Sequence, residues 1–416
     1  MTRILHLSDT HIDRSLGRLS RESDIGASLA EVVELVQEHK PDLVIHSGDL
    51  FHGPHPSIGG LGMAFDFLRE VAVTAPIVVV CGNHDSAQLL SILDKALGDR
   101  IHLVTQVRSP HAGGILHFPG SGNEVIRLAP LPFVHPNRIS TDQIFGESAT
   151  WTAGYADYIT KIENMLADGL RENMDFSRDI LLFSAHVHVA GASWSGSEKA
   201  VSVSDAYGST ARSIPPVSYA AMGHIHKPQV VPGLTPGRFS GSLIQMDFGE
   251  EDESKGVVLV DLKPGRPAEI NVIPLTRARQ LKRLSGTIEE IAKDARDLTN
   301  EIVRITVDTP THDPQLSSMI ADALPQDVTL LEVVEHCRDR QLTVLDAHSF
   351  QDSEVETDFV GMFADFLSTQ GSLAAPAADV MSAFQRIFED EDPGEYAHIP
   401  ELDALAEQAA SLDGNA

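Results

Sequence analysis

Five short apolar segments of this chain are each followed within three residues by Asp, Asn or His, and this repeated arrangement constrains the fold more than any other feature. The segments are Ile4–Leu7, Leu43–His46, Ile77–Val80, Ile180–Phe183 and Tyr219–Met222. Short runs rich in β-branched residues are typical of buried strands. Segments with apolar residues at helical spacing alternate with the first three, at Ile25–Glu38, Gly62–Val73 and Ser86–Leu97. This alternation predicts an α/β fold with a parallel sheet that is covered on both faces.

The polar residues that follow these strands form a candidate set of metal ligands: Asp9, His11, Asp49, Asn83, His186, His224 and His226. Because the carboxyl ends of parallel strands open on one crevice, we expect these side chains to meet. Carboxylate, imidazole and amide donors without cysteine suit Mn²⁺, Fe²⁺ or Zn²⁺. Seven ligands exceed the need of one catalytic ion, so we expect two ions that share one carboxylate. The first would be held by Asp9, His11, Asp49 and His226, and the second by Asp49, Asn83, His186 and His224.

Two divalent ions at such a site deprotonate a water molecule at neutral pH and neutralise charge on phosphoryl oxygens, which predicts phosphoester hydrolysis. His84 lies in the same loop as Asn83 and is not needed as a ligand. We expect it to contact the phosphate and to protonate or stabilise the leaving oxygen. Asp85 is expected to orient a neighbouring imidazole. The glycines that precede Asp49, Asn83 and His224 are expected to permit sharp loops and close approach.

The fourth motif leaves one alternative open. His186-Val187-His188 contains a second imidazole, and residues two apart share one face of a strand. The order of the motifs assigns His186 as the ligand, but a shift in strand register makes His188 its rival.

The pattern changes after residue 275. Residues 1–275 are expected to form one domain, a sheet sandwich flanked by helices, with antiparallel strands and loops between Pro110 and Pro136. A basic connector with Arg277, Arg279, Lys282 and Arg283 follows. A small α/β domain is then expected at 276–349, from the helices Ile288–Leu298 and Leu316–Leu324 and the strands Ile302–Val307 and Val328–Val334.

Residues 350–390 contain two amphipathic helical patterns, Val355–Leu367 and Val380–Phe388. Because they have no obvious core of their own, we expect them to dock onto a partner, and packing on the second domain is the alternative. Residues 391–416 are expected to be a disordered acidic tail.

The formal charge of −29 argues against non-specific nucleic-acid binding over the whole surface. From Gln351 to the end, however, the chain has fifteen acidic residues and one basic residue, Arg386. About half of the net negative charge therefore lies after residue 350. Basic residues that follow the ligand motifs are predicted contacts to a DNA backbone, with solvated loops as the alternative. They are Arg14, Arg18, Arg21, Lys199 and Lys227.

The sequence also predicts a cytoplasmic protein. Its two cysteines, Cys81 and Cys337, give no disulfide framework. The first apolar stretch is too short for a signal peptide, and no apolar run is long enough for a membrane-spanning helix.

The motifs taken together resemble those of the calcineurin-like phosphoesterases. Asp-x-His, Gly-Asp, Gly-Asn-His-Asp, a lone His and Gly-His-x-His occur in that order from Asp9 to His226. Lys227-Pro228-Gln229 and Asp247-Phe248-Gly249-Glu250 are similar to late motifs of the DNA break-repair nucleases, which include the nuclease subunit of the bacterial SbcCD complex. The resemblance covers nearly the whole chain, is one of arrangement only in the C-terminal parts, and does not extend to His188.

This resemblance implies a two-metal DNA nuclease that uses Mn²⁺, with double-strand exonuclease and single-strand or hairpin endonuclease activity in DNA break processing and repair. It implies that 276–349 is a capping domain and that 350–390 binds an SbcC-type ATPase. The helices Gly62–Val73 and Ser86–Leu97 are implied to form a homodimer interface. His52 occupies the position that the family links to presenting a strand end for exonuclease cleavage. The resemblance also implies that the protein acts at the nucleoid.

The same metal core serves other reactions, so two further hypotheses stay open. The chain could be a phosphodiesterase or phosphatase for a small nucleotide or a phosphoprotein, although a small substrate does not call for the additional domains. It could also be an adaptor that places an ATPase on DNA without catalysis, although the intact ligand set argues against this.

Overall fold

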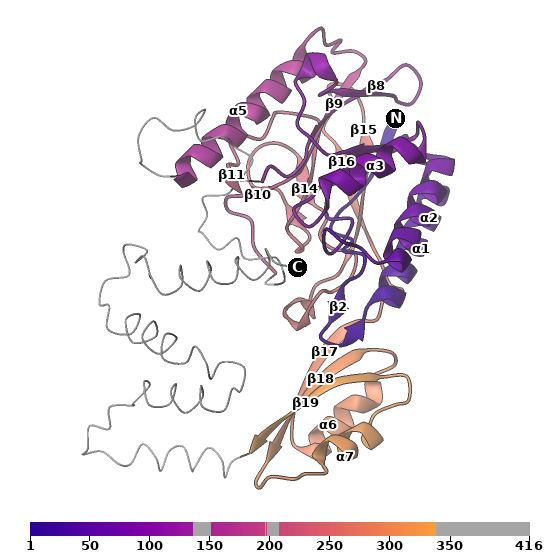
Figure 1. Cartoon of the computed structure of the whole chain (residues 1–416), viewed down its shortest axis with the longest axis vertical. Coiled ribbons are helices and arrows are strands. Elements are labelled where there is room, and N and C mark those ends of the chain that lie inside the picture. Colours follow the sequence, from indigo (N-terminus) through magenta and orange to yellow (C-terminus); the bar gives the residue numbers. More distant parts are fainter. Residues whose placement is uncertain (136–150, 196, 198–207, 338–416) are drawn as a thin grey trace, which may run out of the picture. The chain divides into compact units, whose positions relative to one another are not determined.

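The computed structural model describes residues 1–135, 151–195, 197 and 208–337. All the described residues belong to one compact unit, Met1–Asp339 (Figure 1). Lys199, the partner-binding helices expected at 350–390 and the tail expected at 391–416 therefore lie outside the described residues. Among the helices that are described, none is long and apolar enough to cross a membrane.

Six strands form the first sheet, in the order β16-β15-β1-β4-β5-β6. They are β1 (Thr2–Leu7), β4 (Leu43–His46), β5 (Ile77–Val80), β6 (Ile101–Val104), β15 (Gly256–Leu262) and β16 (Glu269–Pro274). The neighbouring strands β1, β4, β5 and β6 run parallel, whereas β15 is antiparallel to both β1 and β16. The parallel sheet predicted from the alternation of strands and helices is thus confirmed, with an antiparallel edge from late in the chain.

A second six-stranded sheet has the order β13-β14-β12-β9-β8-β7. Its strands are β7 (Leu116–Pro119), β8 (Val125–Leu131), β9 (Asp179–His186), β12 (Tyr219–Gly223), β13 (Gln229–Val230) and β14 (Gly237–Phe239). The four central strands run parallel, and β7 and β13 pair antiparallel at the two edges. The sandwich expected for this part of the chain is confirmed.

The two sheets pack face to face, with helices on both outer faces (Figure 1). Successive side chains of a strand point to opposite faces, so Ile4 packs between the sheets, whereas Leu5 packs under the helices. The first sheet is covered by α1 (Glu22–His39), α2 (Ile58–Thr74) and α3 (Ala87–Leu97), and the second by α5 (Trp151–Arg171). Because both faces of each sheet are buried, the central strands are apolar at nearly every position.

The start of α2 differs from the prediction, which placed it at Gly62. The helix begins at Ile58 because the hydroxyl of Ser57 accepts a hydrogen bond from Gly60 N (2.9 Å) and so caps it. This first turn was not predicted because it contains Gly59 and Gly60, and glycine has a low helix propensity.

Residues 281–337 form a smaller α/β layer. Its parallel strands are β17 (Leu281–Gly286), β18 (Ile302–Thr309) and β19 (Thr329–Cys337), and its helices are α6 (Ile288–Asp294) and α7 (Leu316–Ala323). Short 3₁₀ turns occur at Pro110–Ala112, Phe248–Glu250 and Ala295–Asp297, and the last of these replaces the predicted end of the α6 helix.

The prediction that residues 277–283 are only a connector was wrong, because β17 begins at Leu281. The buried positions of β17 are Leu281 and Leu284, which are three residues apart, so the strand lacks the alternation by which a strand is recognised.

Buried polar groups join this layer to the two-sheet sandwich. The carboxylate of Asp24 on α1 accepts hydrogen bonds from Arg21 and from Arg279. Leu281 N donates to Gln245 Oε1 (2.6 Å), and Leu281 packs with Leu16 and Phe248. Leu16 belongs to the small hairpin of β2 (Ser15–Leu16) and β3 (Leu19–Ser20), which directly follows the first ligand motif.

Candidate metal centre

The structure brings all seven predicted ligands together at the carboxyl ends of β1, β4, β5, β9 and β12. Asn83 is half-buried and the other six side chains are buried. His11 Nε2 and His226 Nε2 face each other at 3.0 Å. Asn83 Oδ1 lies 2.9 Å from both His186 Nε2 and His224 Nδ1. These contacts define two neighbouring groups of donors.

Asp49 and Asp9 connect the two groups. Asp49 Oδ2 lies 3.6 Å from His11 Nε2 and 3.3 Å from His186 Nε2, as expected for a shared carboxylate. The ligand atoms of Asp9 lie within 4.8 Å of those of His11 and His226, and also of those of Asp49 and His186. His224 N donates to Asp9 Oδ1 at 3.1 Å, which fixes the carboxylate.

The backbone of several candidate ligands is in the left-handed region that residues other than glycine rarely adopt. The φ angles are 51° at Asp9, 49° at His11, 56° at Asp49 and 90° at His224. Such conformations cost roughly 1–3 kcal/mol each and tend to cluster at functional sites. Their concentration here indicates that the surrounding sandwich holds these loops in a fixed geometry.

The close approach expected of the glycines is confirmed. A Cβ atom at Gly48, where φ is +103°, would lie 2.1 Å from His186 Nδ1. A Cβ atom at Gly82 would lie 2.1 Å from Asp49 Oδ1, and one at Gly223 would lie 2.0 Å from Ser47 O. Only glycine leaves room for the ligands at these places.

Electrostatics divide the ligands into charged and neutral groups. Burial alone would raise the pKa of Asp49, but His186 and His11 hold that pKa well below its ordinary value. Burial in turn lowers the pKa of His186, yet the Asp49 carboxylate raises it overall to about 9. Burial keeps the pKa values of His11 and His224 well below their ordinary range. The centre therefore presents an ionised Asp49 beside neutral imidazoles at His11 and His224, which are the forms that bind a metal ion, whereas His186 must release a proton before it can bind one.

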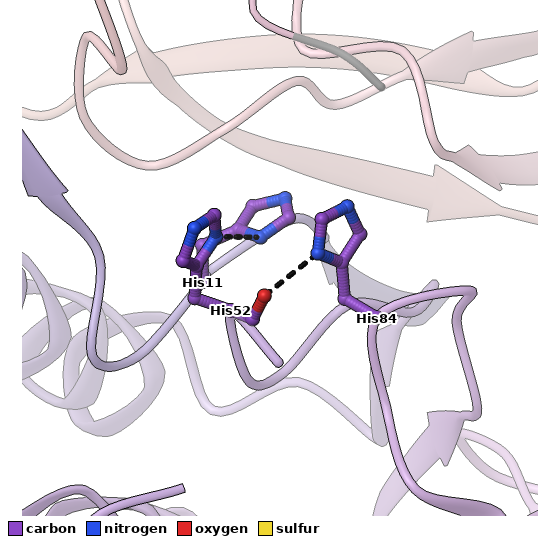
Figure 2. Close-up of side chains that lie close together, drawn as sticks. All are labelled: His11, His52 and His84. Atoms are coloured by element: carbon purple, nitrogen blue, oxygen red, sulfur yellow. Dashed lines mark hydrogen bonds between the residues drawn. The ribbon is translucent and has the colours of Figure 1, made fainter. Parts of the chain in front are cut away.

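His84 and His52 lie beside the ligand His11 (Figure 2). His84 Nδ1 lies 2.7 Å from the carbonyl oxygen of His52. Because a carbonyl only accepts, Nδ1 of His84 carries a hydrogen. The rings of His52 and His84 stack at 5.4 Å, and His52 Nδ1 lies 3.4 Å from His11 Nδ1. Both predicted catalytic histidines are thus next to the cluster.

The role expected for Asp85 was wrong. Its carboxylate accepts hydrogen bonds from the backbone N–H groups of Leu50 (3.3 Å), Phe51 (2.9 Å) and Gly82 (2.9 Å), not from an imidazole. Burial and the nearby Asp49 charge raise its pKa to about 6. Through these bonds Asp85 connects the loop of Asp49 to the loop of Asn83 and so fixes the backbone that carries both ligands.

The choice between His186 and His188 is decided by the end of β9. His186 is the last residue of β9 and faces Asn83 and Asp49, with its Nδ1 2.8 Å from Ser47 O. The ring of His188 instead stacks on Trp194, with centroids 4.5 Å apart. The assignment by motif order therefore agrees with the geometry.

A buried acidic residue, missed by the sequence analysis, orients His226. His226 Nδ1 lies 2.6 Å from Ser197 Oγ, and Ser197 donates its hydroxyl hydrogen to Glu250. Nδ1 of His226 is then the donor to Ser197, which leaves Nε2 to face the metal site. Glu250 also lies 2.7 Å from Lys255 Nζ. The signal in the sequence is weak, because a carboxylate after Asp-Phe-Gly is not recognisable as buried.

The basic residues differ in their positions. Arg21 is completely buried, pairs with Asp24 and donates to the backbone of Gln245 (3.0 Å), so the prediction that it contacts DNA was wrong. Its charge is used inside the protein. Arg14 is half-buried, with Nη1 3.2 Å from His52 Nε2. Arg18 and Lys227 are exposed.

The donor set fits divalent metal ions of the kind expected. It consists of nitrogen and oxygen atoms without sulfur, gathered from five strand ends. His11 Nε2 and His226 Nε2 lie 3.0 Å apart, so a cation beside this pair would be held by both imidazoles.

Comparison with known proteins agrees with this chemistry. The model of the calcineurin-like phosphoesterase family matches residues 2–228, a span that contains every candidate ligand. The SbcD subunit of the nuclease SbcCD from Escherichia coli is 27% identical over 371 residues, which is 86% of this chain and 91% of that protein. The proteins of the same name from Bacillus subtilis (28% identical over 287 residues, 67% of this chain and 71% of that protein) and Rhodobacter capsulatus (29% over 297 residues, 68% and 71%) are also similar.

Proposed function

This chain belongs to the calcineurin-like phosphoesterase family, and we propose that it is a metal-dependent DNA nuclease with two divalent ions in its active site. The observation that carries the proposal is the convergence of seven nitrogen and oxygen donors beside His52 and His84. The choice of DNA as the substrate is supported by the similarity to the SbcD subunits of SbcCD nucleases.

In this proposal, Asp9, His11, Asp49 and His226 hold one ion, and Asp49, Asn83, His186 and His224 hold the other. Mn²⁺ is the proposed metal because mixed carboxylate, amide and imidazole donors suit it. When bound, the two ions supply a water nucleophile at neutral pH and neutralise charge on the phosphoryl oxygens.

The histidines beside the ligands have separate roles. The Nδ1 hydrogen of His84 is held by the carbonyl of His52, so the proton that His84 gives to the leaving oxygen is the one on Nε2. His52 stacks on His84 and is proposed to present the end of a DNA strand for double-strand exonuclease cleavage. The same centre is proposed to cleave single strands and hairpins as an endonuclease. Arg14, Arg18 and Lys227, with Lys199 outside the described residues, are proposed contacts to the DNA backbone.

The proposed partners follow from the family resemblance. Residues 276–349 would cap the active site, and the helices at 350–390 would bind an SbcC-type ATPase in DNA break repair at the nucleoid of the cytoplasm. A homodimer through α2 and α3 is supported by the exposed apolar side chains of Ile58, Val73 and Ile92.

The test is cleavage of labelled single-stranded and hairpin DNA by the purified full chain with Mn²⁺, with the metal content measured in parallel. Asp49→Ala should lose both cleavage and metal, whereas His84→Ala should lose cleavage and retain metal. His55→Ala removes an exposed histidine three residues beyond His52 and should match the wild type.

Three results would contradict the proposal. Faster turnover of a cyclic nucleotide or phosphopeptide than of DNA would favour a small-substrate phosphodiesterase or phosphatase. Cleavage that persists in Asp49→Ala would point to a contaminating nuclease. The absence of cleavage with any divalent ion, with and without an SbcC-type ATPase, would favour a structural adaptor.

A further inference from the structure

An exposed tryptophan borders the metal centre. Trp194 lies in the loop after β10 (His188–Val189), and 41% of its surface is exposed. Its ring meets the ring of the candidate ligand His224 edge to face, with centroids 5.9 Å apart. Tryptophan is highly buried on average, so an exposed indole next to a catalytic centre indicates a surface that a ligand covers.

The buried ring of His188 holds the indole of Trp194 in place. One ring face stacks on His188, with centroids 4.5 Å apart and an angle of 22° between the planes. His188 is itself buried. This contact gives a function to the second imidazole of the His186-Val187-His188 motif, which is not a ligand in this geometry.

The loop before the indole is also fixed. The side-chain amide of Gln229 accepts a hydrogen bond from Ser193 N (2.9 Å) and donates one to Ser193 O (2.7 Å). Gln229 lies three residues beyond the ligand His226, so the same pair of bonds ties the tryptophan loop to a ligand loop. A side chain that is rigid before binding loses little entropy when a ligand covers it.

We propose that Trp194 is a stacking platform for an unpaired nucleobase beside the metal centre. The inference rests on the proposed nuclease function. Every base has a π-face, and stacking on an aromatic side chain stabilises binding by about 1–3 kcal/mol per base without regard to sequence. A base inside a duplex is already stacked and paired, so only a single-stranded, frayed or extruded base can cover the indole.

The first test measures binding without cleavage. The chain has two tryptophans, Trp151 and Trp194, so Trp151→Phe leaves Trp194 as the single tryptophan fluorophore. The full chain with this substitution is titrated in EDTA with a short oligothymidylate and with an abasic oligomer of the same length. We expect the oligothymidylate to quench the emission and the abasic oligomer to leave it nearly unchanged.

The second test measures cleavage with Mn²⁺. Trp194→Ala should raise KM for the oligothymidylate roughly five- to 150-fold, the factor that corresponds to about 1–3 kcal/mol. KM for the abasic oligomer and the metal content should stay at the wild-type values. Trp194→Phe should restore most of the loss. The control is Phe176→Ala, which removes another exposed aromatic ring, in the loop between α5 and β9.

The outcomes separate this inference from the nuclease function. No quenching, equal quenching by both oligomers, or an equal loss on both oligomers in Trp194→Ala overturns the stacking role, even if DNA cleavage by the wild type is intact. If the wild type cleaves no DNA but only the oligothymidylate quenches Trp194, the stacking role stands and the nuclease function fails.

Discussion

Replacing Glu250 with glutamine tests how much the buried residues around the metal centre contribute to stability. The Glu250 side chain is fully buried and lies 2.7 Å from the ammonium of Lys255, which is 4% exposed. It also accepts a hydrogen bond from Met246 N at 2.9 Å. Burial alone would raise the pKa of Glu250, but His226 and Lys255 lower it to about 2.

The magnitude follows from that pKa. Holding the carboxyl at about 2 instead of its ordinary 4.5 corresponds to roughly 3 kcal/mol of stability at neutral pH. Because the folded-state pKa is the lower one, this contribution is fully present above pH 4.5 and is lost as the pH falls toward 2. Lys255 retains Glu253 at 2.7 Å, so part of its charge stays compensated in the variant. We therefore expect Glu250→Gln to lower the free energy of unfolding by about 2–3 kcal/mol at pH 7.

The assay is urea unfolding of the metal-free wild type and Glu250→Gln proteins at several pH values. The difference between the two should narrow as the pH falls below about 4.5. Adding Lys255→Met should recover part of the loss, because it removes the buried ammonium that was left with fewer partners. Glu251→Gln is the matched control, since Glu251 pairs with the exposed Arg283 and should contribute at most about 1 kcal/mol.

The same variant should bind metal roughly 10–100-fold more weakly, because Glu250 orients His226 through Ser197. A wild-type free energy of unfolding in Glu250→Gln, or a difference that does not change with pH, would refute this account of the ion pair.

Three further predictions test the centre and its attachment. Gly82→Ala should abolish metal binding in titration calorimetry, because its Cβ would lie 2.1 Å from Asp49 Oδ1. The control is Gly62→Ala on an exposed face of α2, where the Cβ would have nothing within 4 Å, and this variant should be neutral or stabilising by up to about 1 kcal/mol. Equal behaviour of the two variants would contradict the packing argument. The metal-free protein should lose stability between pH 6.5 and about 9 in thermal melts. Protonation of His186, whose pKa is raised, stabilises the fold below pH 6.5, and this contribution disappears as the pH rises through 9. A His186→Gln variant that shows the same loss would exclude this residue as the cause. Asp24→Ala should destabilise the chain by about 3–5 kcal/mol in urea unfolding, since it leaves the buried Arg21 without its carboxylate, and a cost below about 1 kcal/mol would contradict the buried pairing.

The strands and the ligands could be predicted because both depend on local sequence. A buried parallel strand is a short apolar run, and the residue at its carboxyl end lies at the edge where all such strands open. Asp9, Asp49 and His224 were therefore identifiable without knowledge of which strands are neighbours. The strand β17 could not be predicted in this way, because its buried residues Leu281 and Leu284 do not follow the local alternation that marks a strand.

The pairings of side chains became known only from the folded chain. Arg21 and Arg14 look alike in sequence, yet one is buried against Asp24 and the other contacts His52. Glu250 is one acidic residue among many until Lys255 and Ser197 are placed beside it.

The difference comes from the range of the interactions. Burial and strand direction follow from the apolar pattern of a few consecutive residues, so the sandwich and the positions of the metal ligands could be inferred before any fold was known. The partner of a buried charge can come from a distant part of the chain, as Asp85 and the amide of Phe51 show. Folding must satisfy nearly every buried polar group, and only the assembled structure determines which residue does so.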